Sequence, residues 1–121
     1  MHVAYVVLYV ENQEACLDFW SRSLGMVIKN QRPAGDFSVI QIGFPDQEFN
    51  LELVPLALMQ QFEHGLDLAT PSMAFRVADL EKTHRELRSK NVETSEINEQ
   101  AGVPSFAFSD NEGRWFAVLS S

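Results

Sequence analysis

The sequence contains two similar copies of one pattern, and this duplication restricts the possible folds more than any other feature. A β-rich run at residues 5–10 leads into a helical pattern, and a second such run at residues 72–77 does the same. At this spacing Asn12 corresponds to Asp79, and both residue types cap helix N-termini by accepting a backbone hydrogen bond. We therefore expect two β-α-β-β-β units of similar structure.

The rest of each copy follows from hydrophobic periodicity and from turn residues. Apolar positions at helical spacing predict a first helix over residues 12–23, which Gly25 ends. A second helix is predicted over residues 79–90, which Asn91 ends. The strands that follow are predicted at residues 26–32, 37–44 and 48–54 in the first copy and at residues 92–97, 105–109 and 115–120 in the second. Loops are predicted at residues 33–36, 45–47, 101–104 and 110–113.

The predicted fold class is α+β, and the length of 121 residues suits a single domain over residues 1–121. Its first module comprises residues 1–54 and its second module residues 72–121. Residues 55–71 form a linker, in which Pro near the start and Gly65 near the end predict a short helix.

Composition excludes several classes of protein. The content of 45% hydrophobic and 21% charged residues is ordinary for a globular protein. Cys16 is the one cysteine, so no internal disulfide can form and we expect a reducing, cytoplasmic compartment. We see neither a signal peptide nor an apolar run of the roughly 18 residues that span a bilayer, so no membrane partner is expected. A net charge of −8 argues against nucleic acid and is compatible with a cationic ligand, although acidic charge also serves solubility alone.

The two ends of the duplicated pattern resemble a known family. Residues 5–15, together with the aromatic pair and the Leu-Gly ending within residues 19–25, resemble the opening of the vicinal oxygen chelate superfamily. That group holds glyoxalases, bleomycin-resistance proteins, extradiol dioxygenases and fosfomycin-resistance enzymes. Residues 108–118 resemble its closing hairpin and last strand, with Asn111 in place of the common proline. The resemblance implies two βαβββ modules that form a half-open mixed β-barrel around a cleft, a fold that hosts many chemistries.

The resemblance also places four metal-ligand positions, one on each of four strands. These positions, usually His, Glu, His and Glu, fall on Tyr5, Glu52, Ser72 and Ala117. Only Glu52 keeps a ligating group of the usual kind. Because a catalytic metal site needs about three protein ligands, we expect no cofactor, with a divalent metal as the alternative.

Strand alternation indicates which side chains line the cleft, because successive residues point to opposite faces of a sheet. Glu52 is expected to be its polar anchor, as a cation ligand, a base or a hydrogen-bond acceptor from Tyr5 or Ser72, against the alternative of a carboxylate wetted by water. Trp115 is expected to stack on a ligand or to pack in the cleft wall. Arg76 is expected to lie on the surface at a strand end, against the alternative of pairing with an acidic ligand or with Glu52. The expected ligand-binding residues are Tyr5, Val7, Glu52, Ser72, Arg76 and Trp115, and no catalytic residue is assigned.

These expectations lead to a metal-free binding protein that sequesters a small molecule in an aromatic-lined cleft, by analogy with the bleomycin-resistance proteins. Two alternatives stay open. One is a metal-dependent, glyoxalase-like lyase or isomerase with an atypical ligand set that includes Glu52. The other is a regulatory or assembly module with a degenerate cleft. We also expect a homodimer, because members of the family commonly dimerise and a half-open barrel leaves sheet edges that a partner covers.

Overall fold

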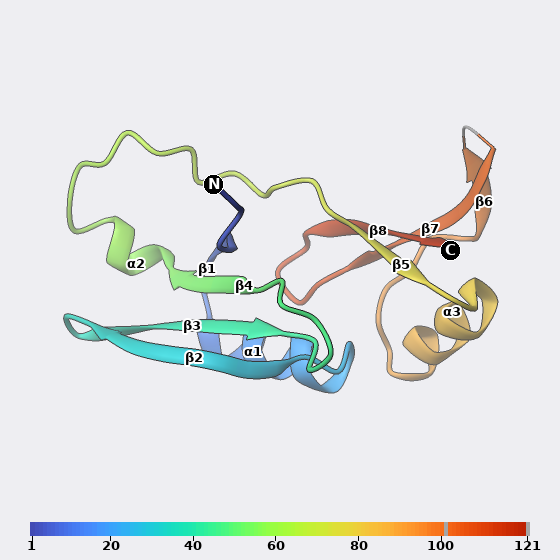
Figure 1. Cartoon of the computed structure of the whole chain (residues 1–121), viewed down its shortest axis with the longest axis horizontal. Coiled ribbons are helices and arrows are strands. Elements are labelled where there is room, and N and C mark those ends of the chain that lie inside the picture. The colour runs from blue at the N-terminus through green and yellow to red at the C-terminus, as the bar shows by residue number, and fades with distance from the viewer. Residues whose placement is uncertain (101, 121) are drawn as a thin grey trace. The chain divides into compact units, whose positions relative to one another are not determined.

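The computed structural model describes residues 1–100 and 102–120, with the side chain of Gln100 left out. These residues form two compact units, Met1–Pro71 and Ser72–Ser121 (Figure 1). Each unit has its own four-stranded mixed sheet, which confirms the predicted α+β class with two β-α-β-β-β modules. That the two units make up a single domain stays a prediction.

The first unit contains a sheet with the strand order β1-β4-β3-β2. Strand β1 is parallel to β4, whereas β3 is antiparallel to both of its neighbours. The predicted linker folds partly into a short helix that follows β4 directly (Figure 1). The elements are β1 (Val6–Val10), α1 (Gln13–Arg22), β2 (Val27–Ala34), β3 (Phe37–Gly43), β4 (Leu51–Pro55) and α2 (Leu56–Met59).

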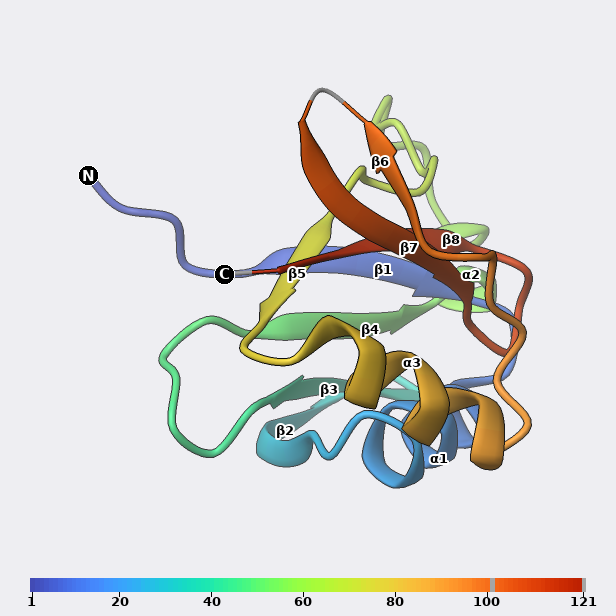
Figure 2. The ribbon, with the colours of Figure 1, turned by 90° about the vertical axis from the view of Figure 1, so that its right-hand side faces the viewer.

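The second unit repeats this topology with the strand order β5-β8-β7-β6 (Figure 2). In the first sheet Val7 pairs with Glu52, and in the second Ala74 pairs with Ala117. The repeat spacing that aligns Asn12 with Asp79 also aligns Val7 with Ala74, so the two pairs occupy equivalent places in their sheets. No helix in the described part of the chain is long and apolar enough to cross a membrane. The elements are β5 (Ala74–Val77), α3 (Leu80–Ser89), β6 (Asn98–Gln100), β7 (Val103–Ser109) and β8 (Trp115–Ser120).

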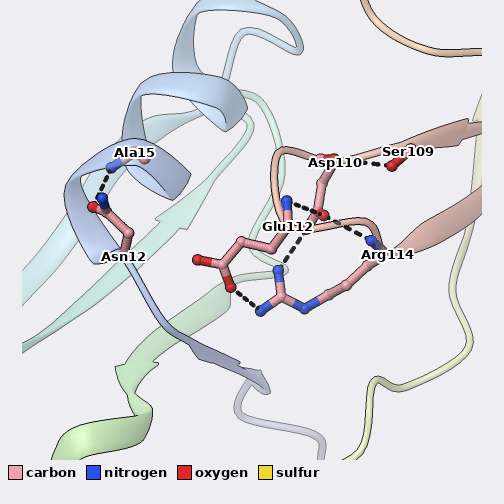
Figure 3. Close-up of polar contacts among 6 residues, drawn as sticks. All are labelled: Asn12, Ala15, Ser109, Asp110, Glu112 and Arg114. Carbon is pink, nitrogen blue, oxygen red and sulfur yellow. Dashed lines mark hydrogen bonds and ion pairs between the residues drawn. The ribbon is translucent and has the colours of Figure 1, made fainter.

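The helix caps confirm the duplication at the level of single residues. Asn12 has φ −125° and ψ 96°, and Asp79 has φ −125° and ψ 95°. Each of these side chains accepts a hydrogen bond from the backbone N–H three residues later, at 3.0 Å and 3.1 Å (Figure 3 shows the first). Beyond the helices, Gly25 and Asn91 both adopt positive φ, which only such residues tolerate easily, so both predicted helix ends are confirmed.

The core of each unit lies between its helix and one face of its sheet. Helix α1 contacts β4, and α3 contacts β7 and β8. Alternate strand residues are buried on this face, as predicted from the period-two pattern. In the first sheet they are Leu8, Val10, Leu51 and Leu53, and in the second Phe116 and Val118.

The prediction of a strand at residues 92–97 is wrong. This segment makes only an isolated bridge from Thr94, and strand β6 begins later, at Asn98. The reason lies at Ser95, whose hydroxyl oxygen accepts a hydrogen bond from the backbone N–H of Ala107 at 2.8 Å. The carbonyl of Ser95 is in turn bonded to Nε2 of His84 at 2.8 Å. Side-chain bonds therefore add to a short, irregular backbone ladder here, in which Ser95 donates to the Ala107 carbonyl at 2.8 Å and Ser109 donates to the Glu93 carbonyl at 2.9 Å.

The predicted loops are too long in two places, and the strands β4 and β5 begin at Leu51 and Ala74, later than predicted. Pro33 lies within β2, where it pairs with Ser38, because β2 is an edge strand and an edge residue needs no N–H for the ladder. Pro104 lies within β7 but beyond the residues of β7 that pair with β8, while Ala101 of the same predicted loop lies outside the described residues.

Candidate functional site

A row of three residues crosses the face of the first sheet that points away from α1. Glu52 on β4 pairs with Val7 on β1 and with Gln41 on β3. Directly paired residues on neighbouring strands share a face, so these three side chains lie side by side. The flanking residues of β4, Leu51 and Leu53, occupy the opposite, helix-covered face.

Glu52 is buried, with 3% of its surface exposed, and its charge is compensated within the first unit. Arg32 of β2 donates from Nη1 to Oε1 of Glu52 at 2.7 Å. Gln41 donates from Nε2 to the same oxygen at 3.1 Å. A buried carboxylate without such partners is strongly disfavoured, so these two donors explain why the sheet can hold a charge at this position.

The electrostatics of the pair keep Arg32 charged. The hydrogen bond to Glu52 raises the pKa of the Arg32 guanidinium, and the charge of Glu52 raises it further. Tyr5 makes a smaller contribution in the same direction. Half of the Arg32 side chain, 49%, remains exposed. The site therefore combines a buried anion with a partly exposed cation that does not titrate near neutral pH.

Two acceptor atoms of the row remain available. Within residues 1–100 and 102–120, no hydrogen bond reaches Oε2 of Glu52 or the amide oxygen of Gln41. Since a carboxylate offers about four lone-pair directions, Glu52 can still accept hydrogen bonds from another molecule.

Beside this polar row lies an apolar cluster, which we call the α2 cluster. Its buried members come from β3, β4 and α2, and further apolar residues of the first unit pack against them. Tyr9 belongs to it and supplies an aromatic ring. The α2 cluster consists of Val39, Val54 and Met59 with Val7, Tyr9, Ala34, Leu58 and Leu68 around them.

The structure places half of the expected ligand-binding residues in this region. Tyr5, Val7 and Glu52 belong to the first unit, where Tyr5 is exposed and acts on Arg32. The expected hydrogen bond from Tyr5 to Glu52 is replaced by those from Arg32 and Gln41.

The other expected residues belong to the second unit. Ser72, Arg76 and Trp115 are all exposed there. Ala117 pairs with Ala74 and Ala107, so the row of the second sheet that corresponds to Val7, Glu52 and Gln41 consists of alanines.

Arg32 and Gln41 are the site residues that sequence reasoning missed. Gln41 is the one amide in an otherwise apolar central stretch of its strand, residues 39–42, and this pattern could have identified it as a candidate site residue. Arg32 gives no such signal, because its approach to Glu52 depends on the register of β2 on β3 and of β3 on β4.

The residues of the site do not fit the divalent metal that the resemblance makes possible. Among the residues that the structure describes, no group of three or more His, Cys, Asp or Glu side chains could hold a metal ion. The guanidinium of Arg32 also occupies Oε1 of Glu52 and would repel a cation at that oxygen. The absence of a cofactor nevertheless stays a prediction.

Comparison with known proteins identifies the family. Residues 2–118 match the sequence model of the Glyoxalase/Bleomycin resistance protein/Dioxygenase superfamily. The chain belongs to this superfamily. The resemblance predicted from the opening and closing segments is therefore confirmed.

Individual members of the superfamily are similar over nearly the whole chain. YurT of Bacillus subtilis (strain 168) is 29% identical over 98% of this chain and 98% of its own length. The crystal structure of TnmS3, an antibiotic binding protein from Streptomyces sp. CB03234, has a TM-score of 0.80 at 18% identity and covers 99% of this chain and 95% of its own. A superfamily member from Sphaerobacter thermophilus DSM 20745 has a TM-score of 0.79 at 20% identity and covers 100% of this chain and 98% of its own. At these identities the two structures show the fold alone.

The closing hairpin of the superfamily holds a second polar cluster, but its groups are used within the turn (Figure 3). Asp110 accepts from the backbone N–H groups of Glu112 and Arg114, both at 2.9 Å, and pairs with Nη1 of Arg114 at 2.7 Å. Glu112 pairs with Nη2 of Arg114 at 2.7 Å. Burial lowers the pKa of Arg114, but its bonds to the two carboxylates outweigh this and leave the pKa raised. This cluster stabilises the turn before Trp115.

Proposed function

We propose that this superfamily member is a metal-free binding protein that sequesters a small molecule on the face of the first sheet around Glu52. The observation that carries the proposal is the buried carboxylate, which is held by Arg32 and Gln41 and still has Oε2 available. Small-molecule sites are mostly apolar with a few well-placed polar groups. The α2 cluster beside the row supplies the apolar surface and, through Tyr9, an aromatic ring.

The comparison with TnmS3 supports binding over catalysis. That protein has the same fold and is an antibiotic binding protein, so the fold can serve ligand binding. The geometry of Glu52 points the same way, because Arg32 and Gln41 both bind Oε1 and hold the carboxylate in one orientation. That Trp115 stacks on a ligand stays a separate prediction, and Trp115 is exposed on the second unit.

We further propose a homodimer in a reducing cytoplasm. Cys16 is buried and outside any disulfide, which is compatible with that compartment. The edge strand β2 is not the expected dimer contact, because three of its features discourage pairing with another strand. They are the irregular register between Ile28 and Asn30, the charge of Lys29, and Pro33. Size-exclusion chromatography with light scattering tests the dimer, and a mass of 13.7 kDa alone would reject it.

Binding is tested by titrating the protein with a library of small polar aromatic compounds and recording proton–nitrogen NMR spectra. We expect hits that shift the side-chain amide signals of Gln41, and we expect Glu52→Ala to abolish them. Glu96→Ala is the matched control, because Glu96 is also paired with an arginine, at 2.9 Å, but lies in the second unit. Hits that survive Glu52→Ala would refute the site.

Metal analysis separates binding from the enzymatic alternative. Protein purified without chelators is expected to contain no stoichiometric divalent ion. One equivalent of zinc, nickel or manganese that is lost in Glu52→Ala would instead support the glyoxalase-like lyase or isomerase.

A further inference from the structure

We infer that the ligand group at Glu52 is uncharged and carries a hydrogen-bond donor beside an acceptor, as primary amides, lactams and ureas do. This inference rests on the proposed function and specifies the chemistry that the same site selects. It also replaces the expectation of a cationic ligand, which came from the net charge of the whole chain.

The charges on this face add up to zero. Glu52 contributes one negative charge and Arg32 one positive charge, and their atoms are 2.7 Å apart. The other members of the row, Val7 and Gln41, are uncharged, as is Asn30, which pairs with Gln41. The net charge of −8 therefore has no local counterpart at this face.

A charged ligand group would meet a like charge at this pair. A cation that approaches Oε2 of Glu52 comes close to the guanidinium of Arg32, and an anion that approaches Arg32 comes close to the carboxylate. Since Glu52 is 3% exposed, water screens this repulsion poorly. A ligand with net charge would also leave that charge uncompensated at a buried position, which is strongly unfavourable.

The available hydrogen-bonding groups complement an amide edge. Glu52 offers Oε2 as an acceptor, and Gln41 offers its amide oxygen. Arg32 uses Nη1 for Glu52, and a guanidinium has five N–H donors, so half-exposed Arg32 retains donors for a ligand carbonyl. A ligand N–H can thus bind Glu52 while the adjacent carbonyl binds Arg32.

Three probes of nearly the same shape separate the possibilities: benzamide is neutral, benzamidine is cationic and benzoate is anionic. Each is titrated into the full chain to about 10 mM, the range in which fragment-sized ligands bind, and the Gln41 side-chain signals are followed by NMR. We expect benzamide to bind at least about tenfold more tightly than either charged probe.

Charge-changing variants then shift the preference in known directions. Arg32→Gln leaves Glu52 as the only charge of the pair, so benzamidine is expected to become the tightest probe. Glu52→Gln leaves Arg32, so benzoate is expected to take that place. Arg32→Lys keeps the charge and the preference for benzamide, and it covers the case in which Arg32→Gln fails to fold. Arg88→Gln is the control, because Arg88 is 45% exposed and also pairs with a glutamate, in the second unit.

The outcomes distinguish the inference from the proposed function. If benzamidine or benzoate binds the unaltered protein most tightly while shifting the Gln41 signals, the inference is overturned and the binding site stands. If none of the three probes shifts signals of this face at about 10 mM, the inference and the proposed site are both overturned. A preference that Arg88→Gln changes as much as Arg32→Gln would also overturn the inference.

Discussion

Replacing Asp110 with alanine is expected to destabilise the protein far more than removal of an exposed aspartate with the same ion-pair geometry. The Asp110 side chain is 0% exposed and the Arg114 side chain 10% exposed. Asp110 binds Nη1 of Arg114 at 2.7 Å and two backbone N–H groups of the turn, each at 2.9 Å (Figure 3). Its loss leaves two turn donors without this acceptor and a mostly buried guanidinium with reduced compensation.

The magnitude follows from this burial. Breaking a buried pair by removing one partner costs about 3–5 kcal/mol, and we expect the cost of Asp110→Ala to fall in that range. It does not exceed that range, because Glu112 continues to pair with Arg114. Asp110→Asn keeps an oxygen for the backbone donors and is expected to cost about half as much. The free energy of unfolding is measured from urea titrations followed by circular dichroism.

The exposed pair between Arg22 and Asp18 provides the control. It has the same i,i+4 spacing and the same 2.7 Å distance, but the Asp18 side chain is 58% exposed. Asp18→Ala is therefore expected to cost less than about 1 kcal/mol. If Asp110→Ala and Asp18→Ala lowered the free energy of unfolding equally, the argument from burial would be wrong.

Three further outcomes are expected. Arg32→Gln is expected to lower the melting temperature in calorimetry more than Glu52→Gln. Arg32→Gln leaves the buried Glu52 carboxylate without its cation, whereas in Glu52→Gln the half-exposed Arg32 can be hydrated. Equal shifts in melting temperature would contradict this. Gly43→Ala destabilises the protein by about 1–3 kcal/mol in urea titrations, since its Cβ would lie 2.7 Å from a backbone carbonyl oxygen. The hydrogen bond from Arg88, and then its charge, holds the pKa of Glu96 below its ordinary value. An NMR pH titration is therefore expected to show that this carboxylate protonates at lower pH than in Arg88→Gln.

The parts of the fold that were predictable depend on local chemistry. Asn12 and Asp79 cap helices through their own side chains, and Gly25 and Asn91 end helices through their backbone freedom. The alternation of apolar residues along single strands likewise predicts which face of each sheet is buried against its helix. The segment around Ser95 was not predictable, because its hydroxyl and carbonyl bond to β7 and α3, which are distant in sequence.

The candidate site was predictable only in part for the same reason. Position 52 follows from the resemblance and from strand alternation, so Glu52 could be named. Its partners Arg32 and Gln41 depend on two strand registers in succession, which no local pattern encodes. The charge of the ligand stays a prediction, because the net charge of the chain does not reveal that Arg32 pairs with Glu52 locally.

The two repeats hold different chemistry at equivalent positions, and this divergence explains why the proposed site lies on the first sheet. The registers place Ala117 where the first repeat has Glu52, and Ala107 where it has Gln41. Asn98 corresponds to Arg32 in the strand registers. Arg32 pairs with Val39 of β3, two residues before Gln41. Asn98 pairs with Ser105 of β7, two residues before Ala107. A carboxylate introduced by Ala117→Glu would therefore lack a cation unless Asn98→Arg is added. A double-mutant cycle is expected to give a favourable coupling of about 0.5–1 kcal/mol between the two changes, and zero coupling would show that the registers of the two sheets do not bring equivalent positions together.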